Sequence, residues 1–181
     1  MQRVGAFNGK RLVIFVLIPI VLFVFLVVLD QLTKFFAARD KVRITLIDNF
    51  FYLSYSVNTG AGFSFLANKE WGQILFKIIT PFALIAFGFF YYFAVKKSYK
   101  WLVVSIVFII SGTIGNFLDR LINSAVVDFL SFKFGSYYFP TFNVADICLT
   151  VGVIMVIVHF LFLDKNAVFA KKRVESENEN P

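Results

Sequence analysis

Four long stretches with few or no charged residues constrain this chain more than any other feature of its sequence. They are Leu12–Leu29, Ile78–Val95, Trp101–Ile122 and Ile147–Leu163. A helix that crosses a bilayer needs about 20 mostly apolar residues, and a chain of 181 residues that is 59% hydrophobic could not bury so much apolar surface in water. The sequence therefore predicts a mainly α-helical membrane protein with four spans, at about residues 12–30, 74–95, 101–122 and 143–163.

The first stretch has a basic start, as a signal peptide would. Its apolar core is too long for one, and the sequence VVLDQLTK at its end contains no small-residue cleavage site. We therefore interpret it as a retained helix and expect residues 1–165 to form a single membrane domain. The chain ends in KKRVESENENP, which is charged and lacks aromatic side chains, so a disordered cytoplasmic tail is expected over residues 166–181.

Four spans place both termini on the same side of the membrane. The segments on that side hold ten Lys and Arg residues against seven on the other side, although they are less than half as long. Basic residues concentrate in cytoplasmic loops, so both termini are predicted to be cytoplasmic. The same rule explains the net charge of +7 without a nucleic-acid partner.

The segment between the first two spans has a different character. It is rich in aromatic and β-branched residues over 44–66, and Asn58, Thr59 and Gly60 form a turn signal within it. We expect a small β-sheet on the outer membrane surface, between the first and second helices. The pattern supports two interpretations equally: the Phe residues contact lipid or a lipidated partner, or the sheet only covers the helix ends.

Polar residues gather at the outer ends of the third and fourth spans. Asn116, Asp119 and Arg120 follow the three- and four-residue spacing that puts side chains on one helix face. Asn143 and Asp146 do the same in the fourth span. Ionisable groups at membrane depth are costly and indicate function, whereas helix capping and interfacial anchoring are the structural alternative.

Asp128 is harder to explain structurally, because its neighbours on both sides are apolar and no base is adjacent to it. The segment from Asp128 to Asp146 contains Gly135 and Pro140 and is long enough for the chain to reverse direction. The two carboxylates can therefore come together. Two carboxylates in contact share a proton. One then activates water as a general base while the other polarises the scissile carbonyl, so the pattern favours aspartic protease chemistry.

Other chemistries fit the sequence less well. His159, the only histidine, follows Asp146 by about 20 Å along the same helix, which is too far for a triad or a shared metal. We expect it at the membrane interface. Cys148, the only cysteine, excludes a multi-cysteine metal site and is expected to act as a small hydrophobic side chain. No metal or cofactor is therefore expected.

Two non-enzymatic classes of protein are also compatible with four spans. A small transporter subunit would place charges near the bilayer midplane, where these spans contain no acidic residue. An assembly factor could use the Phe-rich outer segment to bind partners, but it would not need two isolated acids.

Five motifs follow one another between Asp30 and about Gly152. They are DQLTK with Asp30 and Lys34, NTGAGFSF from Asn58, GTIGNFLDR through Asn116 and Arg120, VVDF at Asp128, and YYFPTFNVAD ending at Asp146. In this order they resemble the lipoprotein signal peptidase family, also called signal peptidase II. Gly62 stands where the family commonly has alanine, and Ser111 where it commonly has glycine.

The resemblance implies a bacterial inner-membrane aspartic endopeptidase. Its substrate would be a prolipoprotein whose cysteine carries diacylglycerol, cut just before that cysteine, near the outer face of the membrane. The matching motifs imply that Asp128 and Asp146 are the catalytic pair, and we expect a monomer in contact with membrane lipid. Residues expected to bind substrate or support the site are Asn58, Gly60, Asn116, Arg120 and Asn143, and those of a structural motif are Asp30, Lys34 and Asp119.

Recognition of the substrate's lipid is a further expectation. Burying acyl chain is worth about 0.8 kcal/mol per methylene, so a few methylenes would give a large preference for the lipidated substrate. The residues expected to supply an apolar rim beside the turn at 58–60 are Phe50, Phe51, Phe63 and Phe65.

Overall fold

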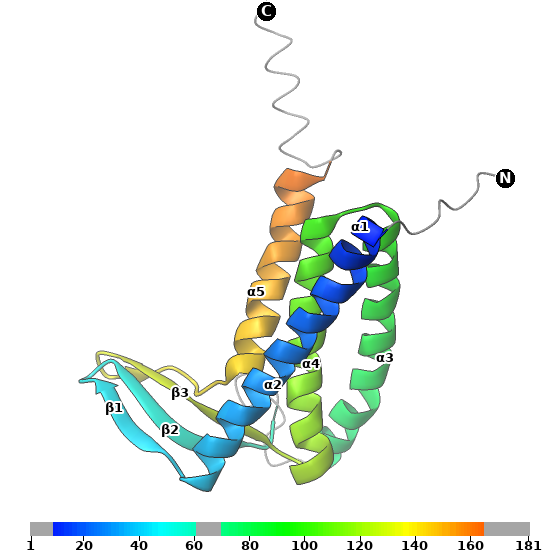
Figure 1. Cartoon of the computed structure of the whole chain (residues 1–181). Coiled ribbons are helices and arrows are strands. Elements are labelled where there is room, and N and C mark those ends of the chain that lie inside the picture. Colours follow the sequence, from blue (N-terminus) through cyan, green and yellow to red (C-terminus); the bar gives the residue numbers. More distant parts are fainter. Residues whose placement is uncertain (1–8, 61–69, 165–181) are drawn as a thin grey trace, which may run out of the picture.

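A computed structural model describes residues 9–60 and 70–164 of the chain (Figure 1). These residues contain four helices long and apolar enough to cross a membrane: Gly9–Arg39, Trp71–Lys96, Lys100–Asn123 and Val144–Leu163. In Figure 1 the helices stand side by side as a bundle, and a small sheet extends from one end of it. The predictions for Phe63, Phe65 and the tail over 166–181 fall outside the described residues.

The four spans are built from seven helical elements. They are α1 (Gly9–Leu12), the π-helical turn η1 (Val13–Leu17), α2 (Ile18–Arg39), α3 (Glu70–Lys96), α4 (Lys100–Asn123), α5 (Val144–Val158) and the π-helical turn η3 (His159–Leu163). The mainly helical fold predicted from the four apolar stretches is confirmed.

The first span is longer than its apolar stretch. It continues to Arg39, whereas the sequence predicts an end near Asp30. Its 31 residues extend over about 46 Å, more than the hydrocarbon core of about 30 Å. The charges of Asp30 and Lys34 do not end the helix, because the two side chains form a buried ion pair of 2.8 Å one turn apart.

Helix α4 lies at the centre of the bundle and contacts α2, α3 and α5. In its most apolar window 56% of the residues are buried, against 17% or less in the other three spans. Small residues allow the closest approach: a Cβ on Gly112 would overlap the carbonyl oxygen of Ala145, and one on Gly152 would lie 2.6 Å from Ile109 Cγ1. The first turn of α5 is therefore fixed against α4.

Four antiparallel strands form the sheet in chain order: β1 (Arg43–Ile47), β2 (Phe51–Asn58), β3 (Val126–Phe134) and β4 (Tyr137–Tyr138). The small sheet expected between the first two helices is present as β1 and β2, and β3 and β4, which lie between α4 and α5, extend it. The run VVDFLSFKF is β-branched and aromatic, as strands are, and Asp128 interrupts it. Ser56 pairs with Asp128 and Asn58 with Val126, so the end of β2 lies beside this carboxylate.

Aromatic rings join the sheet to the segment that leads into α5. Phe51 and Phe132 stack on neighbouring strands with centroids 4.5 Å apart, and Phe132 also stacks on Phe142 at 5.8 Å. A β-bridge between Leu130 and Phe142 strengthens the same contact. Stacked rings add to the stability gained from burial, so these contacts hold the strand that carries Asp128 close to the start of α5.

The C-terminal end of α5 lies away from the sheet (Figure 1), and His159 follows this end as the first residue of η3. The side chain is buried within the protein, at 3% exposed. Its ring packs on Tyr99 with centroids 4.9 Å apart, and its Nε2 lies 4.0 Å from Asp164 Oδ2. The histidine therefore belongs to the packing of that helix end.

Candidate active site

The two predicted carboxylates come from different elements. Asp128 lies on β3, and Asp146 lies in the first turn of α5. Asn143 is the N-cap of α5 and forms a capping box with Asp146: its Oδ1 accepts from the Asp146 N–H at 2.9 Å, and Asp146 Oδ2 accepts from the Asn143 N–H at 3.2 Å. Such a box satisfies two free backbone donors at the helix start, and here it also fixes the carboxylate.

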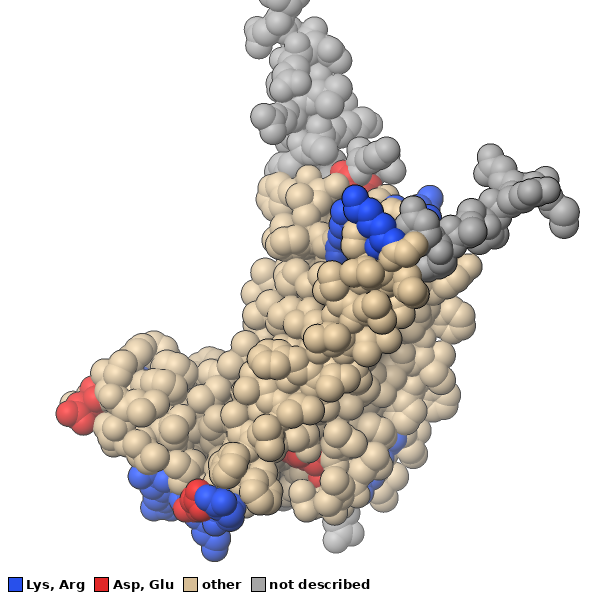
Figure 2. Space-filling model, viewed as in Figure 1, with Lys and Arg blue, Asp and Glu red and all other residues tan. Residues whose placement is uncertain are grey.

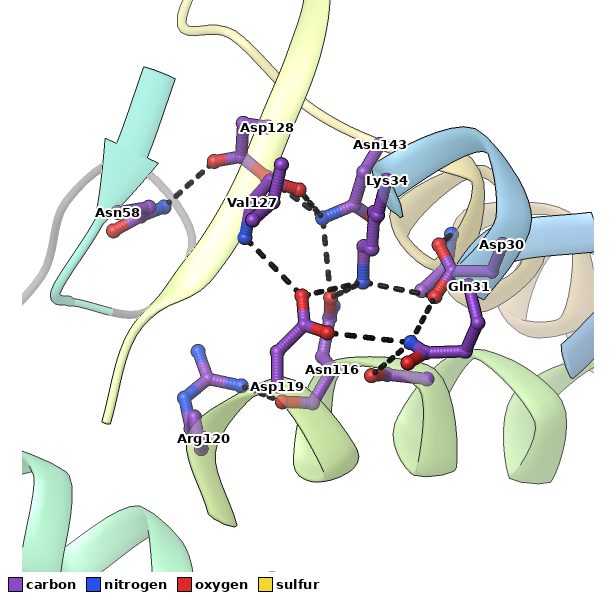
Figure 3. Close-up of polar contacts among 12 residues, drawn as sticks. Asp30, Gln31, Lys34, Asn58, Asn116, Asp119, Arg120, Val127, Asp128 and Asn143 are labelled. Atoms are coloured by element: carbon purple, nitrogen blue, oxygen red, sulfur yellow. Dashed lines mark hydrogen bonds and ion pairs between the residues drawn. The ribbon is translucent and has the colours of Figure 1, made fainter. Parts of the chain in front are cut away.

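Side-chain amides complete the hydrogen bonding of both carboxylates. Asp128 accepts from Asn143 Nδ2 at Oδ1, over 2.7 Å, and from Asn58 Nδ2 at Oδ2, over 3.1 Å (Figure 3). Asp146 Oδ1 accepts from Asn116 Nδ2 at 2.8 Å. With the capping box included, each of the four carboxylate oxygens receives a hydrogen bond from a neutral N–H group.

The surroundings of Asp128 favour its protonated form. The residue is 2% exposed. Burial and the neighbouring charge of Asp146 raise the pKa of Asp128 to about 6, while the hydrogen bonds from Asn58 and Asn143 and the charge of Lys34 oppose the rise. Two carboxyl groups that interact in this way do not titrate independently of each other.

A buried ion cluster of Asp30, Lys34 and Asp119 lies near Asp128 (Figure 3). Lys34 Nζ lies 2.8 Å from Asp30 Oδ2 and 3.1 Å from Asp119 Oδ2, and it donates to Asn116 Oδ1 at 2.9 Å. The sequence assigns Asp30, Lys34 and Asp119 to a structural motif. The structure places this motif in direct contact with Asn116, which donates to Asp146.

The turn at the end of β2 is held by α3 and α4. Asn58 Oδ1 accepts from the Gly60 N–H at 2.8 Å, which leaves the amide nitrogen facing Asp128. Arg120 Nη2 donates to the Gly60 carbonyl at 2.9 Å, and its guanidinium lies over the ring of Phe76 at 5.0 Å. The structure thus brings together Asn58, Gly60 and Arg120, three of the residues that the sequence analysis singles out.

Two glutamines contribute to the site although the sequence does not single them out. Gln31 Nε2 donates to Asp30 Oδ2, Gly115 O and Asp119 Oδ1 at 3.1, 3.1 and 3.3 Å. Gln73 Nε2 donates to the carbonyl of Thr59, beside Asn58. Their only signal in the sequence is that each is a polar residue near the end of a long apolar stretch.

A cavity of about 860 Å³ opens onto both carboxylates. Its lining includes five polar residues of the site: Asn58, Asn116, Arg120, Asp128 and Asp146. Its other walls come from α3, α4, α5 and the segment before α5, and include Phe76, Phe142, Leu149 and Val151. Among residues 9–60 and 70–164, no group of three or more His, Cys, Asp or Glu side chains is placed to hold a metal ion.

Four membrane-spanning helices with two coupled carboxylates at a shared cavity define a membrane-embedded enzyme of the aspartic type. The sequence matches the family described as Signal peptidase (SPase) II over residues 22–162. The chain belongs to this family of aspartic peptidases. The family resemblance and the enzyme class predicted from the sequence are confirmed.

Named relatives and solved structures agree with this membership. The chain is 39% identical to a lipoprotein signal peptidase of Symbiobacterium thermophilum, over 82% of this chain and 97% of that protein. It is 41% identical to one from Maridesulfovibrio salexigens, over 74% and 88%. A solved bacterial membrane enzyme shares 34% identity, with a TM-score of 0.72 over 81% of this chain and 89% of that one. A second such structure gives a TM-score of 0.70.

Proposed function

We propose that this multi-pass bacterial membrane protein removes the signal peptide of prolipoproteins, with Asp128 and Asp146 as its catalytic residues. Membership of the lipoprotein signal peptidase family supports the reaction and the substrate class. The assignment of the residues depends on one observation: the two carboxylates line the same cavity and are bound by the same residue, Asn143. The cut falls just before the lipidated cysteine of the substrate.

The two carboxylates take different parts in hydrolysis. In this scheme Asp128 holds the shared proton, because it is the more deeply buried of the two carboxylates, at 2% exposed, and burial raises its pKa. Asp146 is the base, since it lies at the N-terminus of α5, where the helix dipole favours a carboxylate. Asp146 takes a proton from water as the water oxygen attacks the scissile carbonyl carbon, and Asp128 gives its proton to the carbonyl oxygen.

The resulting gem-diol then collapses. Asp146 passes its proton to the amide nitrogen as the C–N bond breaks, and Asp128 recovers a proton from one hydroxyl as the new carboxyl group forms. The dyad returns to its starting state with one proton, and one water has been consumed. Asn58, Asn116 and Asn143 keep both carboxylates in place through these steps, and Arg120 and Gly60 hold the turn that carries Asn58.

The termini are proposed to be cytoplasmic and the site to lie near the outer face. Figure 2 shows a broad uncharged surface over the helices, with charged side chains gathered at its two ends. The excess of Lys and Arg in the terminal segments supports the orientation. A signal peptide crosses the bilayer as an apolar helix, so a site at the outer boundary suits the junction between that helix and the mature lipoprotein.

The sheet is proposed to recognise the diacylglyceryl group of the substrate. Its first strand is exposed along its whole length, and Ile44, Leu46 and Ile47 are each about half exposed. Phe50 is 39% exposed beside the ring of Phe132. These apolar groups lie on the same sheet as Asp128, so acyl chains bound there would hold the cysteine near the dyad. We propose that the enzyme acts as a monomer and needs no cofactor.

The purified protein in detergent, with a diacylated lipobox peptide, tests the assignment. Asp128→Asn and Asp146→Asn are each expected to abolish cleavage while the protein stays folded, because an amide cannot exchange the shared proton. Asp40→Asn is the matched control: Asp40 lies past the end of α2, 54% exposed and paired with Arg39, and its loss should leave the rate unchanged. Substantial turnover by either dyad variant would remove the assignment. Equal cleavage of peptides with and without the diacylglyceryl group would remove the lipid proposal.

A further inference from the structure

Lys34 is a buried cation that the mechanism above does not use. Its side chain is 3% exposed, and its ammonium lies within 3.1 Å of three oxygens, Asp30 Oδ2, Asp119 Oδ2 and Asn116 Oδ1. A protonated lysine has three N–H donors and no acceptor. Every donor of this ammonium therefore has one partner, and two of the partners are carboxylates.

The ammonium determines which way the Asn116 amide faces. An ammonium cannot accept a hydrogen bond, so the oxygen end of the amide must face Lys34, at 2.9 Å. The NH₂ end of the same amide then faces Asp146 Oδ1, at 2.8 Å. The orientation that suits Lys34 is thus the one that donates a hydrogen bond to the proposed base.

A second amide extends this order to the other carboxylate (Figure 3). Asn143 Nδ2 donates to the same Asn116 oxygen at 3.1 Å and to Asp128 Oδ1 at 2.7 Å. The Asn116 oxygen therefore accepts from an ammonium on one side and from an amide on the other. The charge of Lys34 thus sets the donor and acceptor directions in a hydrogen-bond network that reaches both carboxylates.

The acids paired with Lys34 hold the backbone of the same two elements. Asp30 Oδ1 accepts from the N–H of Ala145 at 2.8 Å, and Asp119 Oδ2 accepts from the N–H of Val127 at 3.1 Å. Ala145 and Val127 are the residues that immediately precede the two catalytic carboxylates. Lys34 forms ion pairs with both Asp30 and Asp119. It is therefore linked, through these two acids, to the backbone just before Asp146 and just before Asp128.

We propose that Lys34 is a positioning residue for peptide hydrolysis, which sets the orientation of both catalytic carboxylates through Asn116, Asp30 and Asp119. The proposal rests on the proposed catalytic role of Asp128 and Asp146. It differs from a purely structural role, in which the ion cluster only packs α2 against α4. A structural role predicts that variants lose stability but keep the turnover and pH profile of the folded enzyme.

The charge of Lys34 gives the proposal a pH-dependent readout. The charged groups that act on Asp128 are Asp146 from α5, Arg120 from α4 and Lys34 from α2. Burial and Asp146 raise the pKa of Asp128, and Lys34 lowers it. Loss of the lysine charge should therefore raise this pKa further, and both limbs of the pH–rate profile should move to higher pH.

The experiment compares Lys34→Met with Lys77→Met in the full-length protein, using the diacylated lipobox peptide. Lys77 is the matched control, because its ammonium is exposed on α3 and donates to Ser124 Oγ at 3.0 Å, away from the cavity lining. Lys34→Met is expected to lower kcat about 100-fold, to change KM by less than about threefold, and to move both pH limbs upward. Lys77→Met should match the wild type in all three.

A second variant separates positioning from folding. The double variant Lys34→Met with Asp30→Asn keeps the net charge of the cluster, and the amide oxygen introduced by Asp30→Asn can still accept from the Ala145 N–H. It should melt closer to the wild type than Lys34→Met and still lose kcat about 100-fold, because the Asn116 oxygen has no ammonium in either variant. Wild-type kcat and pH limbs in either folded variant would overturn the proposal.

An infrared titration of the carboxyl groups needs no turnover. The Asp128 band, identified by its loss in Asp128→Asn, should titrate at higher pH in Lys34→Met and at the wild-type pH in Lys77→Met. The two failures are distinguishable: a wild type that cleaves no lipopeptide overturns the proposed function, whereas an active wild type with an unchanged Asp128 band in Lys34→Met overturns the inference about Lys34.

Discussion

Gly115→Ala tests how closely α4 must approach the ion cluster for the site to work. An ideal Cβ on Gly115 would lie 2.5 Å from Asp30 Oδ2 and 3.1 Å from Ala145 Cβ, whereas ordinary contacts begin at 3.4 Å. Either Asp30 or α4 must therefore move by about 0.9 Å. The Asp30 side chain cannot swing away freely, because Oδ2 is in the 2.8 Å ion pair with Lys34 and Oδ1 accepts from the Ala145 N–H.

The expected effects follow from this displacement. Overpacking of a buried contact costs about 1–3 kcal/mol of folding free energy, so the melting temperature should fall. A misplacement of about 1 Å at a catalytic group costs about 100-fold in rate. Because Asp30 holds the peptide before Asp146, kcat should fall by about 10- to 100-fold while KM changes less.

The assay is thermal unfolding in detergent followed by lipopeptide cleavage by the folded fraction. Gly88→Ala is the control, because Gly88 lies within α3 and an added Cβ there meets nothing within 4 Å. Alanine favours a helix more than glycine does, so Gly88→Ala should be as stable as the wild type or more so, with unchanged kcat. Gly115→Ala with wild-type melting and wild-type kcat would refute the argument that this contact positions the site.

Three further predictions concern stability and the outer turn. The pKa of Asp128 is raised from 3.8 to about 6 by burial and Asp146, so about 3 kcal/mol of stability that is present below pH 4 is lost as the pH rises through 6. Asp128→Asn should therefore raise the melting temperature at pH 8 and leave it nearly unchanged at pH 4. Equal changes in melting temperature at the two pH values would contradict this. Gln73→Leu removes the donor to the Thr59 carbonyl and should lower kcat/KM with helix content unchanged by circular dichroism. His159→Ala should lower the melting temperature by removing the contact with Tyr99 but keep the wild-type kcat, and a loss of kcat would contradict the packing role.

The sequence predicts the spans and the two carboxylates because both depend on local contrast. A run of about 20 apolar residues has few alternatives to a membrane helix, and Asp128 and Asp146 stand out against apolar neighbours. The same contrast between charged and apolar residues puts the end of the first helix near Asp30, whereas α2 continues to Arg39. Asp30 and Lys34 look like the start of a polar loop until Asp119 and Asn116 are known to surround the lysine.

Strand β3 shows a second limit of local patterns. Its residues are β-branched and aromatic, but its partner β2 lies about 75 positions earlier in the chain, as the pairing of Asn58 with Val126 and Phe51 with Phe132 requires. The contact of Lys34 with Asn116 likewise joins residues 82 positions apart. Such contacts depend on how the helices pack, so the sequence alone identifies the members of the cluster but not which of them touch.

The arrangement of charges explains why three asparagines surround the dyad. In the described part of the chain no lysine or arginine forms a salt bridge with Asp128 or Asp146. Lys34 is bound to Asp30 and Asp119, and Arg120 donates to the carbonyls of Asn116 and Gly60. A direct ion pair would stabilise the ionised form of either carboxylate, and the pair would lose the shared proton that the proposed mechanism needs.

Neutral amides avoid this effect while they still fix the geometry. Asn58, Asn116 and Asn143 donate to carboxylate oxygens without adding a charge beside them. Lys34 contacts Asn116 rather than either carboxylate of the dyad. From there it orients the Asn116 amide, and its charge only partly offsets the raised pKa of Asp128. The variant Asn143→Lys would place an ammonium beside Asp128 and Asp146. It should stabilise the ionised form of both carboxylates and slow peptide hydrolysis, since the proposed mechanism needs one of them to keep its proton.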